Sequence, residues 1–168
     1  MQDERDRLIA CIPRLRRYAR ALIGDRTGAD DLVQDTMERG WKKLSSWQRG
    51  SDMRAWLFGI MHNLHNDQVR RPNLATEVLD DDTPLPTINA TQTDALEMRD
   101  LQSALATLPT EQREILLLIA LEEMSYVEVA ATLGLPLGTV MSRLSRARQK
   151  LRAHMEGRAI VSSLKIVK

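Results

Sequence analysis

The chain has 168 residues, of which 43% are apolar and 28% charged, and its formal net charge is +1. This length allows one ordinary domain or two small ones that each bury a modest core. No apolar run approaches the roughly 20 residues of a membrane helix, and no basic start followed by an apolar stretch marks a secretory signal. We therefore expect a cytoplasmic protein that does not enter a membrane. The single cysteine, Cys11, excludes an internal disulfide, and its apolar neighbours predict a core position.

Charge is unevenly distributed along the chain. Residues 1–71 hold 14 Lys/Arg against 10 Asp/Glu, residues 72–100 hold 1 against 7, and residues 101–168 hold 9 against 6. Two basic ends thus flank an acidic middle. Residues 141–152 carry five basic side chains and no acidic one, which gives a local field suited to phosphates. Composition alone also allows a solvated helix face there.

Helical periodicity covers the first part of the chain. Apolar residues recur at helical spacing over 4–23, where Pro13 must kink or restart the helix. A second helix is predicted over 29–44, and a third over about 53–70. No stretch alternates apolar and polar residues long enough to predict a strand, so the predicted fold class is all-α.

The periodic pattern dissolves over residues 72–93, which contain three prolines and the acidic run Asp80-Asp81-Asp82. This segment is predicted to be a flexible acidic linker. Fully extended it reaches roughly 70 to 80 Å, and as a flexible coil about 26 Å. The two folded parts are therefore expected to be able to sit well apart.

Helices resume after the linker. Apolar spacing predicts one helix ending near Leu108 and another from Thr110 to about Ile119, with Pro109 between them. Ser125 and Glu128 form the pattern of a capping box, which opens a short helix to about Leu133. A last helix is predicted from about 137 to 155, with its inward stripe at Val140, Leu144, Ala147 and Leu151.

A capped short helix, a glycine-containing turn and a longer basic helix follow the order of a helix-turn-helix, whose second helix enters the major groove of DNA. The inward stripe leaves Ser142, Ser145, Arg146 and Gln149 outermost on that helix, flanked by Thr139 and Arg143. The alternative is an ordinary helical hairpin with a polar face, but the turn, the cap and the basic run coincide here.

These segments resemble a known family. The stretches LPTEQRE at 108–114, MSYVEVA at 124–130 and GTVMSRLSRAR at 138–148 look like the promoter-reading C-terminal domain of extracytoplasmic-function (ECF) sigma factors, a subfamily of bacterial sigma-70-type factors. DDLVQD at 30–35 with Trp41 resembles the family's polymerase-binding helix. RAWL at 54–57, continuing through Asn63 to Arg70 and Arg71, resembles the segment that opens and reads the minus-ten element.

The resemblance implies a transcription initiation factor with no cofactor and no catalytic activity. It implies a polymerase-binding and minus-ten domain over 1–71, the linker over 72–93, a minus-35 domain over 94–158 and a tail over 159–168. The RNA polymerase core, through the clamp of its largest subunit, and promoter DNA are the implied partners. An anti-sigma factor that covers the polymerase-binding surfaces is also implied.

Site residues follow from the same resemblance. Contact with the clamp coiled coil falls to Asp31, Gln34, Asp35, Glu38 and Trp41, although Asp30 and Asp31 are also expected to complement the helix dipole from a first turn. Contact with the minus-ten element falls to Trp56, Asn63, Arg70 and Arg71. Contact with the minus-35 element falls to Thr139, Ser142, Arg143, Ser145 and Arg146.

Other interpretations remain open from the residues alone. A stand-alone helix-turn-helix regulator with an N-terminal sensing domain would bind its operator without polymerase. An enzymatic function lacks support, because the sequence offers no set of residues that could act as nucleophile and base. His62 and His65 lie three apart on a helix in the expected DNA-facing segment, but no third metal ligand is near them in sequence, so no metal site is predicted. Met141 stands where the family motif commonly has Lys or Arg, which predicts either a weaker affinity for the minus-35 element or a different sequence preference.

Overall fold

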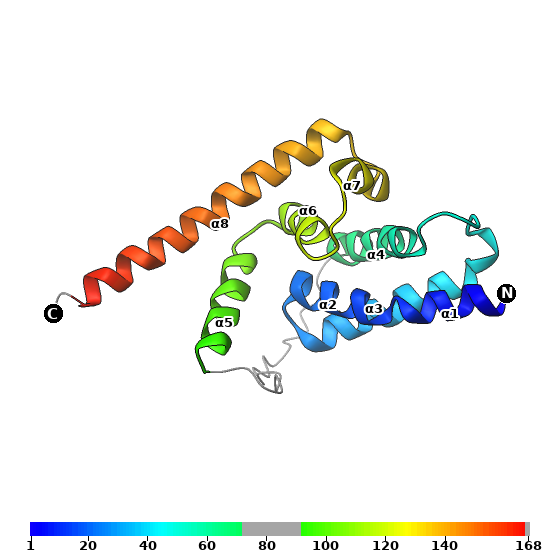
Figure 1. Cartoon of the computed structure of the whole chain (residues 1–168), viewed down its shortest axis with the longest axis horizontal. Helices are drawn as coiled ribbons and strands as arrows, with labels where there is room; N and C mark the ends of the chain where they lie inside the picture. The colour runs from blue at the N-terminus through cyan, green and yellow to red at the C-terminus, as the bar shows by residue number, and fades with distance from the viewer. Residues whose placement is uncertain (72–91, 167–168) are drawn as a thin grey trace.

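A computed structural model describes the backbone of residues 1–71 and 92–166, and the side chains of residues 1–71 and 97–157 (Figure 1). Within these ranges every regular element is a helix and no strand is present. We call α1 to α4 the N-terminal domain and α5 to α8 the C-terminal domain. The elements are α1 (Gln2–Ala10), α2 (Ile12–Ile23), α3 (Arg26–Lys42), the 3-10 turn η1 (Leu44–Ser46), α4 (Met53–Arg70), α5 (Gln92–Ala106), α6 (Thr110–Ala120), α7 (Tyr126–Leu133) and α8 (Leu137–Ile166).

The predicted helix over 4–23 is two helices, because the chain restarts between α1 and α2 with Pro13 in the first turn of α2. A proline is tolerated there, since the first amides of a helix have no partner inside it. Gly24 ends α2 in the left-handed conformation, with φ of 78°. The α3 helix then starts at Arg26, earlier than predicted, because the Asp25 side chain accepts a hydrogen bond from the Gly28 amide at 2.9 Å and caps it.

In the C-terminal domain the capping box at the start of α7 is confirmed: the Ser125 hydroxyl accepts from the Glu128 amide, and the Glu128 carboxylate accepts from the Ser125 amide. Gly134 closes α7 with φ of 66°. The predicted end of the last helix near residue 155 is wrong, because α8 continues to Ile166 through part of the predicted tail. The predicted linker lies outside the described residues except for 92 and 93, which begin α5.

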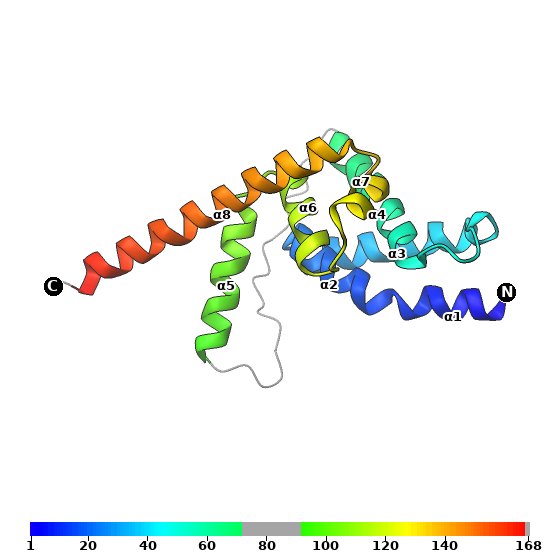
Figure 2. The same ribbon diagram turned by 45° about the horizontal axis from the view of Figure 1, so that its top comes forward.

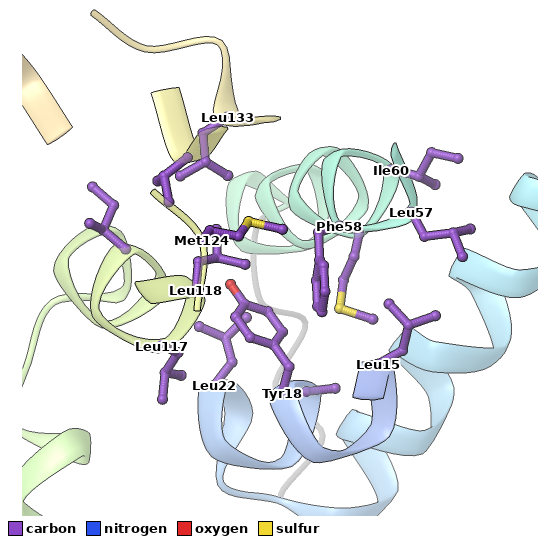
Figure 3. Packing of buried hydrophobic residues seen from close by; sticks show 14 of the residues in the cluster. Leu15, Tyr18, Leu22, Leu57, Phe58, Ile60, Leu117, Leu118, Met124 and Leu133 are labelled. Atoms are coloured by element: carbon purple, nitrogen blue, oxygen red, sulfur yellow. The ribbon is translucent and has the colours of Figure 1, made fainter. Parts of the chain in front are cut away.

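The hydrophobic core joins both domains. α2 packs on α6, α4 packs on α7, and one cluster of buried side chains runs through all four helices. Figure 3 shows Tyr18 and Leu22 of α2 beside Leu118 of α6 and Met124 of the α6–α7 turn. The Tyr18 ring meets that of Phe58 edge to face, with centroids 4.9 Å apart. The two domains, which the linker length would allow to sit apart, are packed together here (Figure 2).

Candidate polymerase and nucleic-acid interfaces

The outer face of α3 presents the side chains predicted to meet polymerase. The inner face is buried through Leu32, Val33 and Thr36, which fixes the orientation of the helix. Gly40 allows close packing against α4, because a Cβ there would lie 2.8 Å from a methyl carbon of Leu57. The opposite face therefore points to solvent, and its exposed residues include all five that were predicted: Asp31, Gln34, Asp35, Glu38 and Trp41.

Two of these side chains have local partners. Lys42 donates to Glu38 at 2.7 Å, and this hydrogen bond lowers the pKa of the Glu38 carboxyl group. Trp41 is 46% exposed, and the Arg5 guanidinium lies 5.0 Å from its ring centroid in a cation–π contact. An indole left half open beside a carboxylate row is a typical anchor for a protein partner.

A groove of about 380 Å³ runs between α3 and α4. It joins the acidic α3 face to the basic end of α4, so one continuous surface carries both charges. Its lining residues are Asp35, Glu38, Arg39, Lys42, Leu64, Asp67, Gln68 and Arg71.

The expected dipole role of Asp30 and Asp31 is wrong. Because α3 begins at Arg26, its first turn holds no acidic residue. Asp30 instead lies 3.9 Å from Arg16 and 3.7 Å from Arg20, and so joins α3 to α2 through ion pairs. Asp31 is exposed and remains on the face predicted to bind polymerase.

The α4 helix carries the residues predicted to read the minus-ten element. Its N-terminus is capped by Asp52, whose carboxylate accepts from the Arg54 amide at 2.9 Å. Asn63, Arg70 and Arg71 are exposed, whereas Trp56 is half-buried against α3. The nearby aromatic residues Trp47 and Phe58 belong to the core.

The two histidines of α4 are largely buried, and one of them contacts the C-terminal domain. Nδ1 of His62 lies 2.6 Å from Oε1 of Glu114 on α6, and Nε2 lies 3.1 Å from the Asn66 amide. His65 is buried, and burial lowers the pKa of its imidazole. Across the described side chains, no group of three or more His, Cys, Asp and Glu is placed to hold a metal ion.

The α7–α8 pair has the predicted helix-turn-helix geometry. Val140, Leu144 and Ala147 are buried, which confirms the inward stripe, and Leu151 packs on the same core at half exposure. Ser142, Ser145 and Arg146 are therefore exposed on the outer face. The Ser142 hydroxyl donates to the Thr139 carbonyl at 3.1 Å.

Thr139 and Arg143 are half-buried, and so less exposed than Ser142, Ser145 and Arg146 on the same helix. The Arg143 guanidinium lies 3.7 Å from the Glu111 carboxylate on α6. A DNA contact by Arg143 would therefore compete with this ion pair. A hollow of about 370 Å³ lies beside the helix, between Tyr126 of α7 and the α8 residues Met141, Leu144, Ser145, Arg148, Gln149 and Arg152.

The polar residues that join the two domains were not predicted from the sequence. Glu114 and Glu122 are buried carboxylates in the C-terminal domain. Arg113 donates to four backbone carbonyls, at Leu22 (2.6 Å), Leu105 (2.8 Å), Leu108 (2.8 Å) and Ala106 (3.3 Å). The partners of Arg113 and Glu114 in the N-terminal domain are 91 and 52 residues away in sequence, so no local pattern signals these contacts.

Comparisons with known proteins match both halves of the chain. A family model described as the Sigma2 domain of PhyR matches residues 8–62, and one described as Sigma-70, region 4, matches residues 98–151. The second range contains α6, α7 and the part of α8 that packs on them.

Named relatives extend over most of the chain. An ECF RNA polymerase sigma factor, EcfG of Rhodopseudomonas palustris, is 40% identical over 151 residues, covering 89% of this chain and 83% of that protein. The sigma factor RpoE in a complex with NepR from Bartonella quintana superposes with a TM-score of 0.76 at 36% identity, covering 93% of this chain and 98% of that one. CnrH in a complex with the cytosolic domain of CnrY superposes with a TM-score of 0.70 at 32% identity, covering 94% of this chain and 90% of that one.

The chain therefore belongs to the ECF family of RNA polymerase sigma factors. Proteins of this family are transcription initiation factors. Among the described residues, no helix is long and apolar enough to cross a membrane.

Proposed function

We propose that this sigma factor binds the polymerase core through the exposed α3 face and delivers it to promoters through α4 and α8, in the cytoplasm and in response to a stress or signal. The clamp of the largest subunit meets Asp31, Gln34, Asp35, Glu38 and Trp41. Trp56, Asn63, Arg70 and Arg71 serve minus-ten recognition and opening. Thr139, Ser142, Arg143, Ser145 and Arg146 serve minus-35 recognition.

The observation that carries this proposal is the outward arrangement of the α3 side chains. Three carboxylates, an amide and a half-open indole share one solvent face of a helix whose opposite face is fully packed. Such a face suits a helical partner bearing arginines, because charge-assisted hydrogen bonds to carboxylates are strong and directional.

An anti-sigma partner is part of the proposal. RpoE was solved with the anti-sigma factor NepR, and CnrH with the cytosolic domain of CnrY. Both sigma factors share more than 30% identity with this chain over nearly its whole length. We expect a comparable protein to cover the α3 face and so to compete with polymerase for it.

The test is run-off transcription with purified core polymerase on promoters from the source genome. Specific transcripts that depend on this chain are expected, and they should disappear when the α3 face is altered. The free chain is expected to bind duplex promoter DNA poorly. Tight, specific binding of a promoter by the free chain at physiological salt, without polymerase-dependent transcription, would support a stand-alone regulator instead.

A further inference from the structure

Three arginines of the N-terminal domain surround one carboxylate of the C-terminal domain. The Glu122 side chain is fully buried just after α6 ends. Its Oε1 lies 3.3 Å from Arg17 of α2, and its Oε2 lies 3.6 Å from Arg54 of α4 and 3.7 Å from Arg14 of α2. We call Arg14, Arg17 and Arg54 the arginine site.

The arginine site also binds the end of the α6 backbone. Arg17 donates to the Leu121 carbonyl and Arg54 to the Glu122 carbonyl, both at 2.8 Å. The last carbonyls of a helix have no partner within it and carry the negative end of the helix dipole. The cations that satisfy this helix end therefore come from the other domain, and the contact combines a side-chain anion with helix-end carbonyls.

The charge balance at this place favours an anion. Three guanidinium groups meet the carboxylates of Glu122 and Asp52, the latter 3.3 Å from Arg54, which leaves one formal positive charge in excess. Guanidinium groups are suited to carboxylates because they present several donors in one plane. The arginine site thus has the composition of a carboxylate-binding site, and Glu122 is the carboxylate that fills it.

The fit is loose enough to be reversible. One oxygen of Glu122, Oε2, is buried without a hydrogen bond, and both of its arginine contacts exceed 3.5 Å. Burying a charge costs free energy that such long contacts repay only in part. The Arg14 and Arg17 side chains are 55% and 57% exposed, so water competes with Glu122 directly.

Promoter recognition requires this contact to break, a step that rests on the proposed function. Elements named for positions minus ten and minus 35 lie about 25 base pairs apart, or roughly 85 Å at 3.4 Å per base pair. Two domains hydrogen-bonded to each other at 2.8 Å cannot read both elements at once. The linker's predicted reach of roughly 70 to 80 Å, added to the size of the two domains, allows the required separation.

We propose that Arg14, Arg17 and Arg54 form a carboxylate-binding site on the N-terminal domain, that Glu122 of the same chain occupies it, and that this occupancy, added to the shared hydrophobic core, holds the two DNA-reading domains together in the free protein. Release of Glu122 opens the chain and exposes the arginine site. The Glu122 carboxylate is thus an intramolecular ligand.

The experiment measures domain separation in the full chain without polymerase or DNA, so its result is independent of the proposed function. Dyes are attached to cysteines introduced as Ser45→Cys and Ser103→Cys, both at exposed positions, and Cys11→Ala removes the native cysteine. Energy transfer between the dyes reports the ratio of open to closed molecules. Glu122→Gln keeps the shape but removes the charge, and is expected to raise this ratio roughly tenfold, because hydrogen bonds to charged groups contribute the most. Glu123→Gln, an exposed neighbour of equal charge, is the matched control and should behave as the wild type.

Arg17→Ala, at a side chain that is 57% exposed, provides a second variant that is also expected to open the chain. Combining it with Glu122→Gln should open the chain by less than the two separate effects combined, since the changes share the Arg17–Glu122 contact, while Arg17 also donates to the Leu121 carbonyl. The proposal is overturned if Glu122→Gln and Arg17→Ala keep wild-type energy transfer, if Glu123→Gln opens the chain equally, or if the two changes simply add.

Discussion

His62 of α4 and Glu114 of α6 lie 2.6 Å apart, from Nδ1 to Oε1, across the boundary between the two domains. A carboxylate can only accept, so Nδ1 carries the proton, and Nε2 then accepts from the Asn66 amide at 3.1 Å. Both ring nitrogens of His62 thus form hydrogen bonds within the protein. A histidine in the expected DNA-facing segment serves domain packing instead.

Replacing His62 with Ala should destabilise the protein by about 1–3 kcal/mol, because the buried Glu114 carboxylate loses a donor. Asn63→Ala, on the exposed side of the same helix, should change stability by less than about 0.5 kcal/mol. Urea denaturation followed by circular dichroism measures both. Equal midpoints for the two variants would show that the histidine–glutamate contact contributes nothing.

Stability should fall as the pH drops below the ordinary histidine pKa of about 6.5, and His65 should account for part of the loss. Burial lowers the pKa of His65, partly opposed by Glu114 and reinforced by the charges of His62 and Arg113. Between the pKa of His65 in the unfolded chain and its lower pKa in the folded protein, only the unfolded chain binds the proton. Acid therefore favours unfolding over this pH range. Denaturation at pH 7.5 and 5.5 should show a smaller loss in His65→Gln than in the wild type. An identical loss would assign the acid sensitivity to other groups.

Gly40→Ala should destabilise the N-terminal domain by about 1–3 kcal/mol, because the new methyl group would lie 2.8 Å from Leu57 and force α3 from α4. Gly138→Ala is the matched control, since its methyl group meets nothing within 4 Å on α8. That change should be neutral or stabilise by up to about 1 kcal/mol through helix propensity. Thermal unfolding of the two variants decides, and a tolerated Gly40→Ala would contradict the close helix packing.

Charge reversal at Asp35 and Glu38 should weaken binding to core polymerase while helicity stays native, because both side chains are exposed on α3. Reversal at both Glu97 and Glu156, exposed on α5 and α8, makes the same change in net charge and is the control. A pull-down with core enzyme provides the measurement. Undiminished binding by the folded α3 variant would remove that face from the interface.

Arg146→Ala should reduce polymerase-dependent transcription from promoters that carry an intact minus-35 element, by roughly 1–3 kcal/mol of recognition if the contact is to a guanine edge. The side chain is exposed on α8, opposite the buried Val140, Leu144 and Ala147. A phosphate contact would instead weaken all sequences alike. Run-off assays on matched templates with and without the element separate these cases. Wild-type output on both would mean that α8 meets DNA through another face.

Local signals in the sequence predict most of the helices. The bounds of α4, the Ser125 capping box and the Val140–Leu144–Ala147 stripe all follow from interactions within a few residues of chain. The outward positions of Asp35, Glu38 and Arg146 follow from the same periodicity. A helix exposes whatever its buried stripe does not contain, so the predicted surfaces needed no tertiary information.

The missed features depend on tertiary contacts. Glu122 looks like a surface residue in sequence, and only the approach of Arg17 and Arg54 from 105 and 68 residues away makes its burial possible. The end of α8 was misplaced for a different reason: the inward stripe stops near Leu151, but the helix does not need that stripe to continue. Apolar periodicity predicts only the part of a helix that packs on a core, and it does not predict how far the helix continues beyond that core.

Most of the hydrogen bonds of Arg113 lie within the C-terminal domain. Burial lowers the pKa of its guanidinium, and four carbonyls surround it. Three of them, at Leu105, Ala106 and Leu108, belong to the corner between α5 and α6, and only Leu22 belongs to the other domain. Parting the domains thus removes one acceptor and leaves the corner braced by three. In the proposed open state, α6 therefore keeps its fixed angle to α5.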